Sequence, residues 1–267
     1  MIKAAILTAQ VSFPGLTDFK ASCMAVYRGA LKKPLQPEIT ALKFLSISGT
    51  RPLLDVGGAL GQSVAGMRFF CKDAPVVSFE PNPFFSSRIK QRFQTDLAVK
   101  VETLALSNTD GQFPLYIPIY KYCTFPELGT LDRTEAENWL SSRLYGYNKN
   151  YLTIAEFPCK CVRLDSLHLD PEAIKIDTRC SSSMVIEGGA KTVARSKPAI
   201  LLEATKLSQP CIQFLHGLGY KMFKCRDGLL RRASITDPVD LLLTDAHFRG
   251  APLNEWLESS EQICPVN

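Results

Sequence analysis

One stretch of the chain limits its fold more than any other: Leu53-Leu54-Asp55-Val56-Gly57-Gly58-Ala59-Leu60-Gly61-Gln62-Ser63. The segment from Pro52 to Val56 is mostly apolar and predicts a short buried strand, and a helix is expected to begin near Gln62. The glycines between them lack the Cβ atoms that would keep a ligand away from the backbone, and they allow positive φ angles. Free N–H groups at the start of the helix can bind an anionic group. The stretch therefore predicts a site for a nucleotide-like cofactor.

The positions of the glycines help to decide which cofactor this is. The dinucleotide fingerprint would place its first glycine at Val56, so that glycine is missing. A carboxylate, Asp55, stands at the end of the strand instead, and it would repel a pyrophosphate. It suits the amino group of S-adenosylmethionine (SAM). The alternative is an ordinary strand–turn–helix corner that binds nothing.

A second carboxylate follows at the expected distance. The apolar run from Pro75 ends in Glu80, and its separation from Asp55 corresponds to one strand–helix–strand unit. A carboxylate at this position can accept hydrogen bonds from both hydroxyls of a ribose. The alternative is a solvated glutamate at a strand end.

The composition is that of an ordinary globular protein with a large core. The 267 residues are 46% hydrophobic and 21% charged, which suits one large α/β domain. The net charge of +5 is not concentrated in one segment, so no nucleic-acid partner is predicted. No apolar run in the sequence is long enough to span a bilayer.

The number and spacing of the cysteines indicate the cellular compartment of the protein and whether it binds a metal through thiolates. The 9 cysteines are scattered, and the close pair Cys159-x-Cys161 lacks the two-residue spacer of zinc ligands. Scattered cysteines in odd number favour reduced thiols and a cytoplasmic location. No metal site is predicted.

The order of the predicted elements indicates the fold class. Strands are expected at Pro52–Val56, Pro75–Glu80, Val99–Ser107, Ala173–Asp177, Ala199–Glu203, Tyr220–Cys225 and Val239–Thr244. Helices are expected at Pro37–Leu45, Gln62–Lys72, Phe84–Phe93, Met184–Ser196 and Cys211–Leu218. Strands and helices alternate until the last two strands, which should form a hairpin. This order predicts an α/β fold with a Rossmann-like, mostly parallel, doubly wound sheet and an antiparallel C-terminal hairpin.

Three parts are expected along the chain. Residues 1–50 would form an N-terminal extension packing on the core, residues 51–248 the main domain, and residues 249–267 a surface tail. Phe113–Pro118 predicts an edge strand, because prolines lie near both ends. Residues 119–157 are expected to form a loop or helical insertion over the active site. The many aromatic side chains of this insertion either line a substrate site or pack the insertion down.

Four of the predicted strands end in a carboxylate: Asp55, Glu80, Asp177 and Glu203. In open α/β sheets, ligands bind beyond the carboxyl ends of the strands. Acidic groups gathered there repel one another, so they favour a ligand that bears hydroxyl groups or positive charge. SAM has a ribose diol, an ammonium group and a sulfonium.

A longer series of motifs resembles a known family. The series consists of Asp55–Gln62, Phe79–Pro83, Ala105–Ser107, Leu115–Pro118, Leu164–Leu167, Ile174–Asp177, Gly189–Ala190 and Pro198–Glu203. The same order is typical of FkbM-type SAM-dependent methyltransferases, and the resemblance covers most of the chain. It implies a class I methyltransferase fold for residues 51–248. It also implies transfer of a methyl group from SAM to a hydroxyl of a sugar, glycan or natural-product acceptor.

The resemblance also implies roles for individual residues. Asp55, Gly57 and Gly61 would hold the aminoacyl end of SAM, and Glu80 would hold the ribose. Asn82 would support that turn, and Ala105 to Ser107 would flank the adenine. The predicted cofactor-binding residues are thus Asp55, Gly57, Gly58, Gly61, Glu80, Asn82, Ala105 and Ser107. The predicted base that accepts the hydroxyl proton is Asp177, with Glu203 and His168 as weaker candidates.

The sequence departs from the family at one place. Members usually continue after the fourth-strand aspartate with Val-Glu-Gly-x-Glu, whereas this chain has Asp177-Thr178-Arg179-Cys180-Ser181-Ser182. Local adaptation, loss of activity or a compensated frameshift would each produce such a mismatch. A SAM-binding homologue with weakened or lost catalysis is therefore the second hypothesis. A nucleic-acid methyltransferase or a nicotinamide enzyme is a third, and the missing first glycine and the absence of a concentrated basic region disfavour it.

Overall fold

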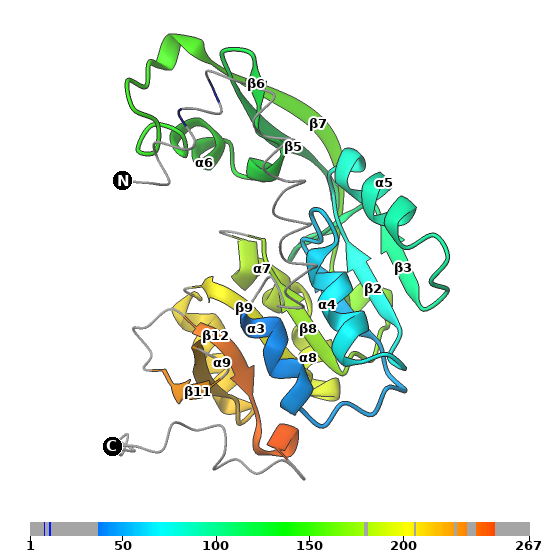
Figure 1. The fold of residues 1–267 in the computed structure, drawn as a ribbon. Coiled ribbons are helices and arrows are strands. Elements are labelled where there is room, and N and C mark those ends of the chain that lie inside the picture. Colours follow the sequence, from blue (N-terminus) through cyan, green and yellow to red (C-terminus); the bar gives the residue numbers. More distant parts are fainter. Residues whose placement is uncertain are drawn as a thin grey trace.

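The centre of the structure, a computed structural model, is an eight-stranded mixed sheet (Figure 1). The structure describes residues 8, 11, 37–178, 181–205, 207–226, 229–233 and 239–248. The strands are β1 (Leu53–Val56), β2 (Val76–Phe79), β3 (Val99–Glu102), β8 (Ala173–Ile176), β9 (Ala199–Thr205), β10 (Lys221–Arg226), β11 (Leu229–Arg232) and β12 (Val239–Leu243). They lie in the order β11-β10-β12-β9-β8-β1-β2-β3.

The direction of the strands confirms the predicted fold class. Strands β3, β2, β1, β8 and β9 pair in parallel, and this is the doubly wound order in which the first strand lies centrally. Strand β12 lies antiparallel between β9 and β10. The antiparallel C-terminal element is therefore present, but it contains one more strand than predicted, because β11 pairs with β10 before the chain reaches β12.

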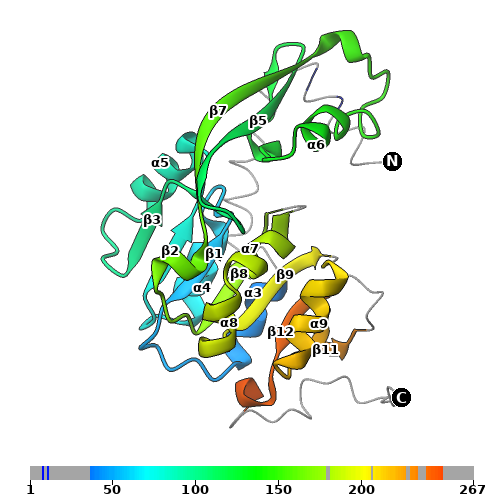
Figure 2. The same cartoon turned by 180° about the vertical axis from the view of Figure 1, so that it is seen from behind.

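Helices cover both faces of this sheet (Figures 1 and 2). One face carries α3 (Pro37–Thr40), the 3₁₀ helix η1 (Ala41–Phe44), α4 (Gln62–Phe70) and α5 (Pro83–Arg92). The other carries α7 (Ser182–Gly188), α8 (Ala190–Ser196) and α9 (Gln209–Gly217). Each face of the sheet has its own hydrophobic core, and successive side chains of β1 point into opposite cores. Leu53 packs in the cluster with Ile39 and Met67, and Leu54 packs in the cluster with Val185 and Leu215.

The single helix predicted from Met184 to Ser196 is two helices, which meet at Gly189. The carboxylate of Asp165 accepts hydrogen bonds from the backbone N–H groups of Lys191 and Thr192, at 3.1 and 2.8 Å. The second helix therefore has its own start, which that carboxylate stabilises.

A second sheet forms an arm that projects from the main body (Figure 1). The arm (residues 111–162) contains β5 (Gly111–Tyr120), β6 (Cys123–Thr124), η2 (Pro126–Leu128), α6 (Arg133–Asn138), η3 (Lys149–Tyr151) and β7 (Leu152–Val162). Strands β5 and β7 pair antiparallel along their length, and β4 (Ala105–Leu106) pairs parallel with the end of β7. Residues 119–157 were expected to form a loop or helical insertion. This expectation was wrong where the range includes the end of β5, all of β6 and the first residues of β7, which begins at Leu152.

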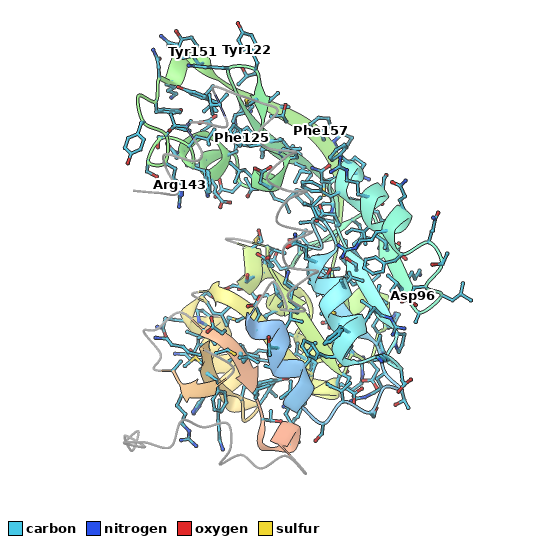
Figure 3. The ribbon with its side chains drawn as sticks, in the orientation of Figure 1. Asp96, Tyr122, Phe125, Arg143, Tyr151 and Phe157 are labelled. Carbon is cyan, nitrogen blue, oxygen red and sulfur yellow. The ribbon has the colours of Figure 1, made fainter. Side chains whose placement is uncertain are left out.

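Several aromatic residues of the arm pack together in one buried cluster, and others are exposed. The rings of Tyr120 and Tyr147 stack with centroids 5.4 Å apart, and Tyr120 and Leu140 belong to one buried cluster. Tyr122 is 95% exposed and lies at the far end of the arm (Figure 3). Val11 packs against the same cluster, so this described residue of the N-terminal segment contacts the arm. The domain boundaries at residues 50 and 248 stay predictions, and residues 249–267 lie outside the described residues.

Candidate functional site

The glycine turn after β1 is held between its two neighbouring strands. Gly57 has a φ of 87°, and its N–H donates to the carbonyl of Phe79 at 2.9 Å. The N–H of Asp177 donates to the carbonyl of Val56, also at 2.9 Å. A Cβ atom on Gly57 would collide with the carbonyl of Asp177. Only glycine combines this φ with so close an approach to the end of β8.

A cavity of about 300 Å³ lies beside this turn, at the carboxyl ends of β1, β2 and β8. It is lined by Val56, Gly57, Ala59, Phe79, Glu80, Pro81, Asn82, Phe85, Ala105, Leu106, Leu115, Pro126, Glu127, Gly129, Thr130, Leu131, Asp177, Thr178 and Ser181. The arm contributes Leu115, Pro126, Glu127 and the segment from Gly129 to Leu131. The cavity therefore lies between the sheet edge and the base of the arm, where a doubly wound fold binds its ligand.

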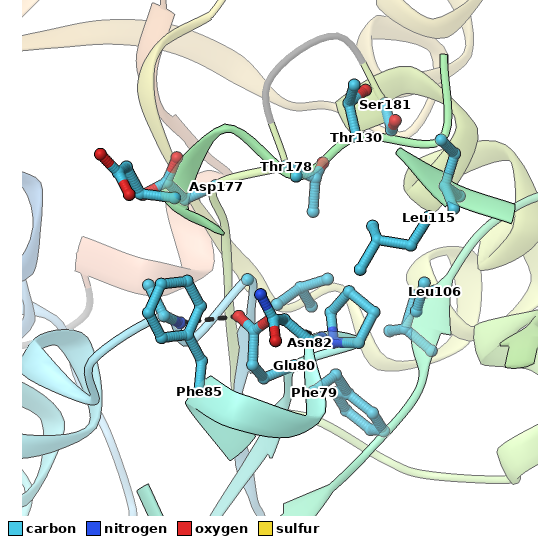
Figure 4. Close-up of a pocket in the computed structure, with 18 of the residues that line it drawn as sticks. Phe79, Glu80, Asn82, Phe85, Leu106, Leu115, Thr130, Asp177, Thr178 and Ser181 are labelled. Atoms are coloured by element: carbon cyan, nitrogen blue, oxygen red, sulfur yellow. Dashed lines mark hydrogen bonds between the residues drawn. The ribbon is translucent and has the colours of Figure 1, made fainter. Parts of the chain in front are cut away.

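Glu80 is fixed at the edge of this cavity by the backbone on both sides. Its Oε2 accepts from the N–H of Ala59 at 2.8 Å, and its Oε1 accepts from the N–H of Asn82 at 2.9 Å. Burial raises the pKa of Glu80 to about 7, although these two hydrogen bonds oppose the shift. Each carboxylate oxygen keeps lone pairs that can accept a hydroxyl group. Figure 4 shows Glu80 and Asn82 on one side of the cavity, opposite Asp177 and Thr178.

Asp55 lies inside the sheet and does not line the cavity. Its side chain is 0% exposed, and its Oδ2 accepts from the hydroxyl of Ser78 at 2.8 Å. Its Oδ1 lies 3.7 Å from the ammonium of Lys175 and has no hydrogen bond among the described residues. A Cβ on Gly58 would lie 2.9 Å from Oδ2 of Asp55, so the glycine is needed to make room for this carboxylate.

Lys175 is the residue that sequence analysis missed. Its side chain is 1% exposed, and its Nζ lies 3.2 Å from Oδ2 of Asp177. Burial lowers the pKa of Lys175, but the carboxylates of Asp55 and Asp177 outweigh burial and hold it above its ordinary value. The one sequence signal was a lysine at the centre of the apolar strand Ala173–Ile176.

The wall beside Asp177 carries hydroxyl groups. The side chain of Asp177 is 31% exposed, and Thr178 and Ser181 line the cavity next to it. Ser182, which stands where the family pattern has a glutamate, is buried, and its hydroxyl lies 3.5 Å from that of Thr178. Arg179 and Cys180 lie outside the described residues.

The predicted site residues divide into two groups in the structure. The cavity is lined by Gly57, Glu80, Asn82, Ala105 and Asp177. The lining does not include Asp55, Gly58, Gly61 or Ser107, whose predicted contact with a cofactor stays a prediction. Glu203 belongs to β9, and its side chain lies outside the described residues.

The histidines lie away from this cavity, and the described residues contain no cluster suited to a metal. His168 is exposed, and the buried His247 accepts a hydrogen bond through Nδ1 from the N–H of Thr244 at 2.9 Å. Within the described ranges, no group of three or more His, Cys, Asp or Glu side chains could hold a metal ion. Nor does the described part of the chain contain a helix with the length and apolarity to cross a bilayer.

Comparison with known proteins gives matches in structure only. No family model matches the sequence, and no curated protein matches it. The chain is similar to a crystal structure of the methyltransferase FkbM from Methylobacillus flagellatus, with a TM-score of 0.46 and 15% identity over 76% of this chain and 46% of that one. A second match is precorrin-6y C5,15-methyltransferase from Geobacter metallireducens, with a TM-score of 0.37 and 14% identity over 77% of this chain and 84% of that one. The chain spans less than half the length of the FkbM structure, and at these TM-scores and identities the likeness assigns no activity to this chain.

Proposed function

We propose that the protein is a SAM-dependent methyltransferase that transfers a methyl group to a hydroxyl oxygen of a small-molecule or saccharide acceptor. The observation that carries this proposal is the carboxylate of Glu80. Backbone N–H groups of Ala59 and Asn82 fix both of its oxygens at the edge of the cavity. A buried carboxylate held in this way is suited to accept the two hydroxyl groups of a ribose.

The charges around the cavity support SAM over a dinucleotide. The lining contains the carboxylates of Glu80, Glu127 and Asp177, and no Lys, Arg or His among the described residues. Such a lining repels a pyrophosphate and attracts the ammonium and sulfonium groups of SAM. Apolar side chains at the other end of the cavity, such as Leu106 and Leu115, suit an adenine ring. The residues present therefore fit SAM.

In the proposed reaction, the protein orients the reactants and moves one proton. When bound, SAM supplies an activated methyl group. Gly57, Glu80 and Asn82 would hold the cofactor, and the side chain of Asp177 would accept the proton of the acceptor hydroxyl. A neutral hydroxyl is a poor nucleophile, so a carboxylate in the cavity wall raises its reactivity. Most of the rate enhancement would come from orientation, up to about 7–11 kcal/mol.

A second candidate is a SAM-binding protein with weakened catalysis. Thr178 and Ser181 line the cavity beside Asp177, and Ser182 is buried where the family pattern has a carboxylate. Among the described residues of this wall, Asp177 therefore provides the carboxylate. If turnover needs a second carboxylate there, the protein binds SAM and transfers methyl groups slowly.

The test is titration calorimetry with SAM and with NAD, followed by transfer of a labelled methyl group from SAM to a panel of saccharides and small hydroxyl compounds. We expect SAM to bind and NAD not to bind. Replacement Glu80→Gln should weaken SAM binding at least tenfold, which corresponds to about 1.4 kcal/mol. NAD binding without SAM binding would reject the proposal, and SAM binding without methyl transfer would favour the second candidate.

A matched control is available on the neighbouring strand. Glu102 ends β3 beside Glu80, whose N–H donates to the carbonyl of Glu102 at 3.0 Å. Its side chain does not line the cavity and pairs with Lys100 at 2.8 Å. Glu102→Gln should leave the affinity for SAM unchanged. An equal loss in both variants would mean that Glu80 acts through overall charge and not through contact with the cofactor.

A further inference from the structure

We propose that Lys175 is a positioning residue, which holds the glycine turn and the end of β8 in the geometry that binds the cofactor. The proposal rests on the proposed function, since the ligand it names is SAM. Lys175 does not line the cavity, so it acts through residues that do.

The first step is that one ammonium group joins three parts of the site. Nζ of Lys175 lies 3.2 Å from Oδ2 of Asp177, 3.5 Å from the carbonyl oxygen of Gly57 and 3.7 Å from Oδ1 of Asp55. These acceptors come from the end of β8, from the turn and from β1. The ammonium donates hydrogen bonds to Asp177 and Gly57, and its charge faces the carboxylate of Asp55 as an ion pair.

The second step is that this arrangement is buried and charged. Lys175 and Asp55 are 1% and 0% exposed, so both charges have lost their water. The carboxylates near Lys175 include Glu38 from α3, which is buried as well. Removing one partner of a buried pair leaves the other uncompensated, whereas replacing both by neutral groups is often tolerated. The ammonium is therefore the group on which the geometry of these carboxylates depends.

The third step links this cluster to the cavity. Gly57 and Asp177 line the cavity, and Lys175 contacts both. Without the ammonium, the turn would lose its side-chain link to the end of β8 and would keep the backbone hydrogen bond from the N–H of Asp177 to the carbonyl of Val56. A turn that is free to move binds a ligand less tightly, because the ordering has to occur on binding.

The same strand spacing occurs elsewhere in the sheet and provides a control. Lys100 and Glu102 on β3 form a lysine–carboxylate pair two residues apart, as Lys175 and Asp177 do. The side chain of Lys100 is 73% exposed, and the pair does not line the cavity. Exposed pairs of this kind contribute little. Lys100→Met should therefore leave ligand binding unchanged.

The test measures the dissociation constants of SAM and S-adenosylhomocysteine by calorimetry for the wild type, Lys175→Met, Asp55→Asn, the double variant and Lys100→Met. The double variant removes both buried charges, so it keeps the proposal testable if Lys175→Met does not fold. We expect the double variant to bind both ligands at least tenfold more weakly than Asp55→Asn alone, and by the same factor for each ligand. S-adenosylhomocysteine lacks the sulfonium charge, so equal factors indicate a loss of geometry.

Other outcomes overturn the proposal. Lys175 does not position the site if folded Lys175→Met binds both ligands as tightly as the wild type does, or if the double variant binds them as tightly as Asp55→Asn does. A change for SAM alone would indicate a purely electrostatic effect, and failure of both variants to fold would assign Lys175 to global stability. A wild type that binds neither ligand would remove the proposed function itself, whereas the first three results leave that function standing.

Discussion

Replacement of Gly57 by alanine tests whether the close contact between the glycine turn and β8 is as tight as the structure shows. The new Cβ would collide with the carbonyl of Asp177, and the backbone at Gly57 has a φ of 87°. Both effects destabilise the variant, so a control is needed that has the backbone strain without the collision. Gly219 has a φ of 88°, and a Cβ there would have no atom within 4 Å.

The two substitutions should differ by the energy of the collision. A left-handed conformation costs a non-glycine residue about 1–2 kcal/mol, and the lower conformational entropy of the unfolded alanine chain returns part of this. We therefore expect Gly219→Ala to lose about 1 kcal/mol of unfolding free energy. Forcing a methyl group into a packed site costs about 1–3 kcal/mol more. Gly57→Ala should therefore lose about 2–4 kcal/mol.

The assay is urea unfolding of the wild type and the two variants, followed by circular dichroism and evaluated by linear extrapolation. Calorimetry with SAM is the second readout, because Gly57 lines the cavity. Gly57→Ala should weaken SAM binding at least tenfold, and Gly219→Ala should not change it. Unfolding free energies of the two variants that agree within about 0.5 kcal/mol would refute the close contact on which the site is built.

Two further predictions concern buried polar groups. Burial raises the pKa of Glu80 from 4.5 to about 7, so the folded protein binds this proton more tightly than the unfolded chain does. The resulting stabilisation is present below pH 4.5 and is lost as the pH rises through about 7, which lowers the unfolding free energy by about 3 kcal/mol relative to that of Glu80→Gln. Urea unfolding of both proteins at several pH values measures this loss. A difference between their unfolding free energies that does not change with pH would contradict the prediction. Ser78→Ala removes the hydroxyl that donates to Asp55 at 2.8 Å and should cost about 1–3 kcal/mol. In the control Ser86→Ala, the lost hydroxyl has only neutral partners: it donates to the carbonyl of Pro83 at 3.2 Å and accepts from the hydroxyl of Thr103 at 3.0 Å. Equal losses in thermal unfolding would argue against a special role for the charged acceptor.

The central sheet could be predicted because its signals are local. Strands β1, β2, β8 and β9 are mainly apolar runs with a glycine, a proline or a carboxylate near their ends, and helices α4, α5 and α9 lie close to their predicted bounds. Asn82 at the start of α5 is an example, since its side chain accepts from the N–H of Phe84 at 3.0 Å. These signals act within a few residues, so they can be read without knowing which strands pair.

The arm and the buried cluster could not be predicted, because their partners are distant in sequence. Leu152–Val162 lies antiparallel to Gly111–Tyr120, and the segment between them gives no sign of this pairing. Lys175 likewise contacts Asp55, more than a hundred residues earlier. Asp55 ends its strand as predicted, but a strand end does not show whether its side chain faces the ligand or the interior.

The short strand β4 connects two parts of the molecule that otherwise have separate cores. Ala105 and Leu106 form the cavity wall, and they also pair with Cys161 and Val162 at the base of the arm. The same two residues thus belong both to the cavity wall and to the sheet that carries the long β5–β7 ribbon. The shape of the cavity therefore depends on where the arm is held, because one wall of the cavity is built from backbone that belongs to the sheet of the arm.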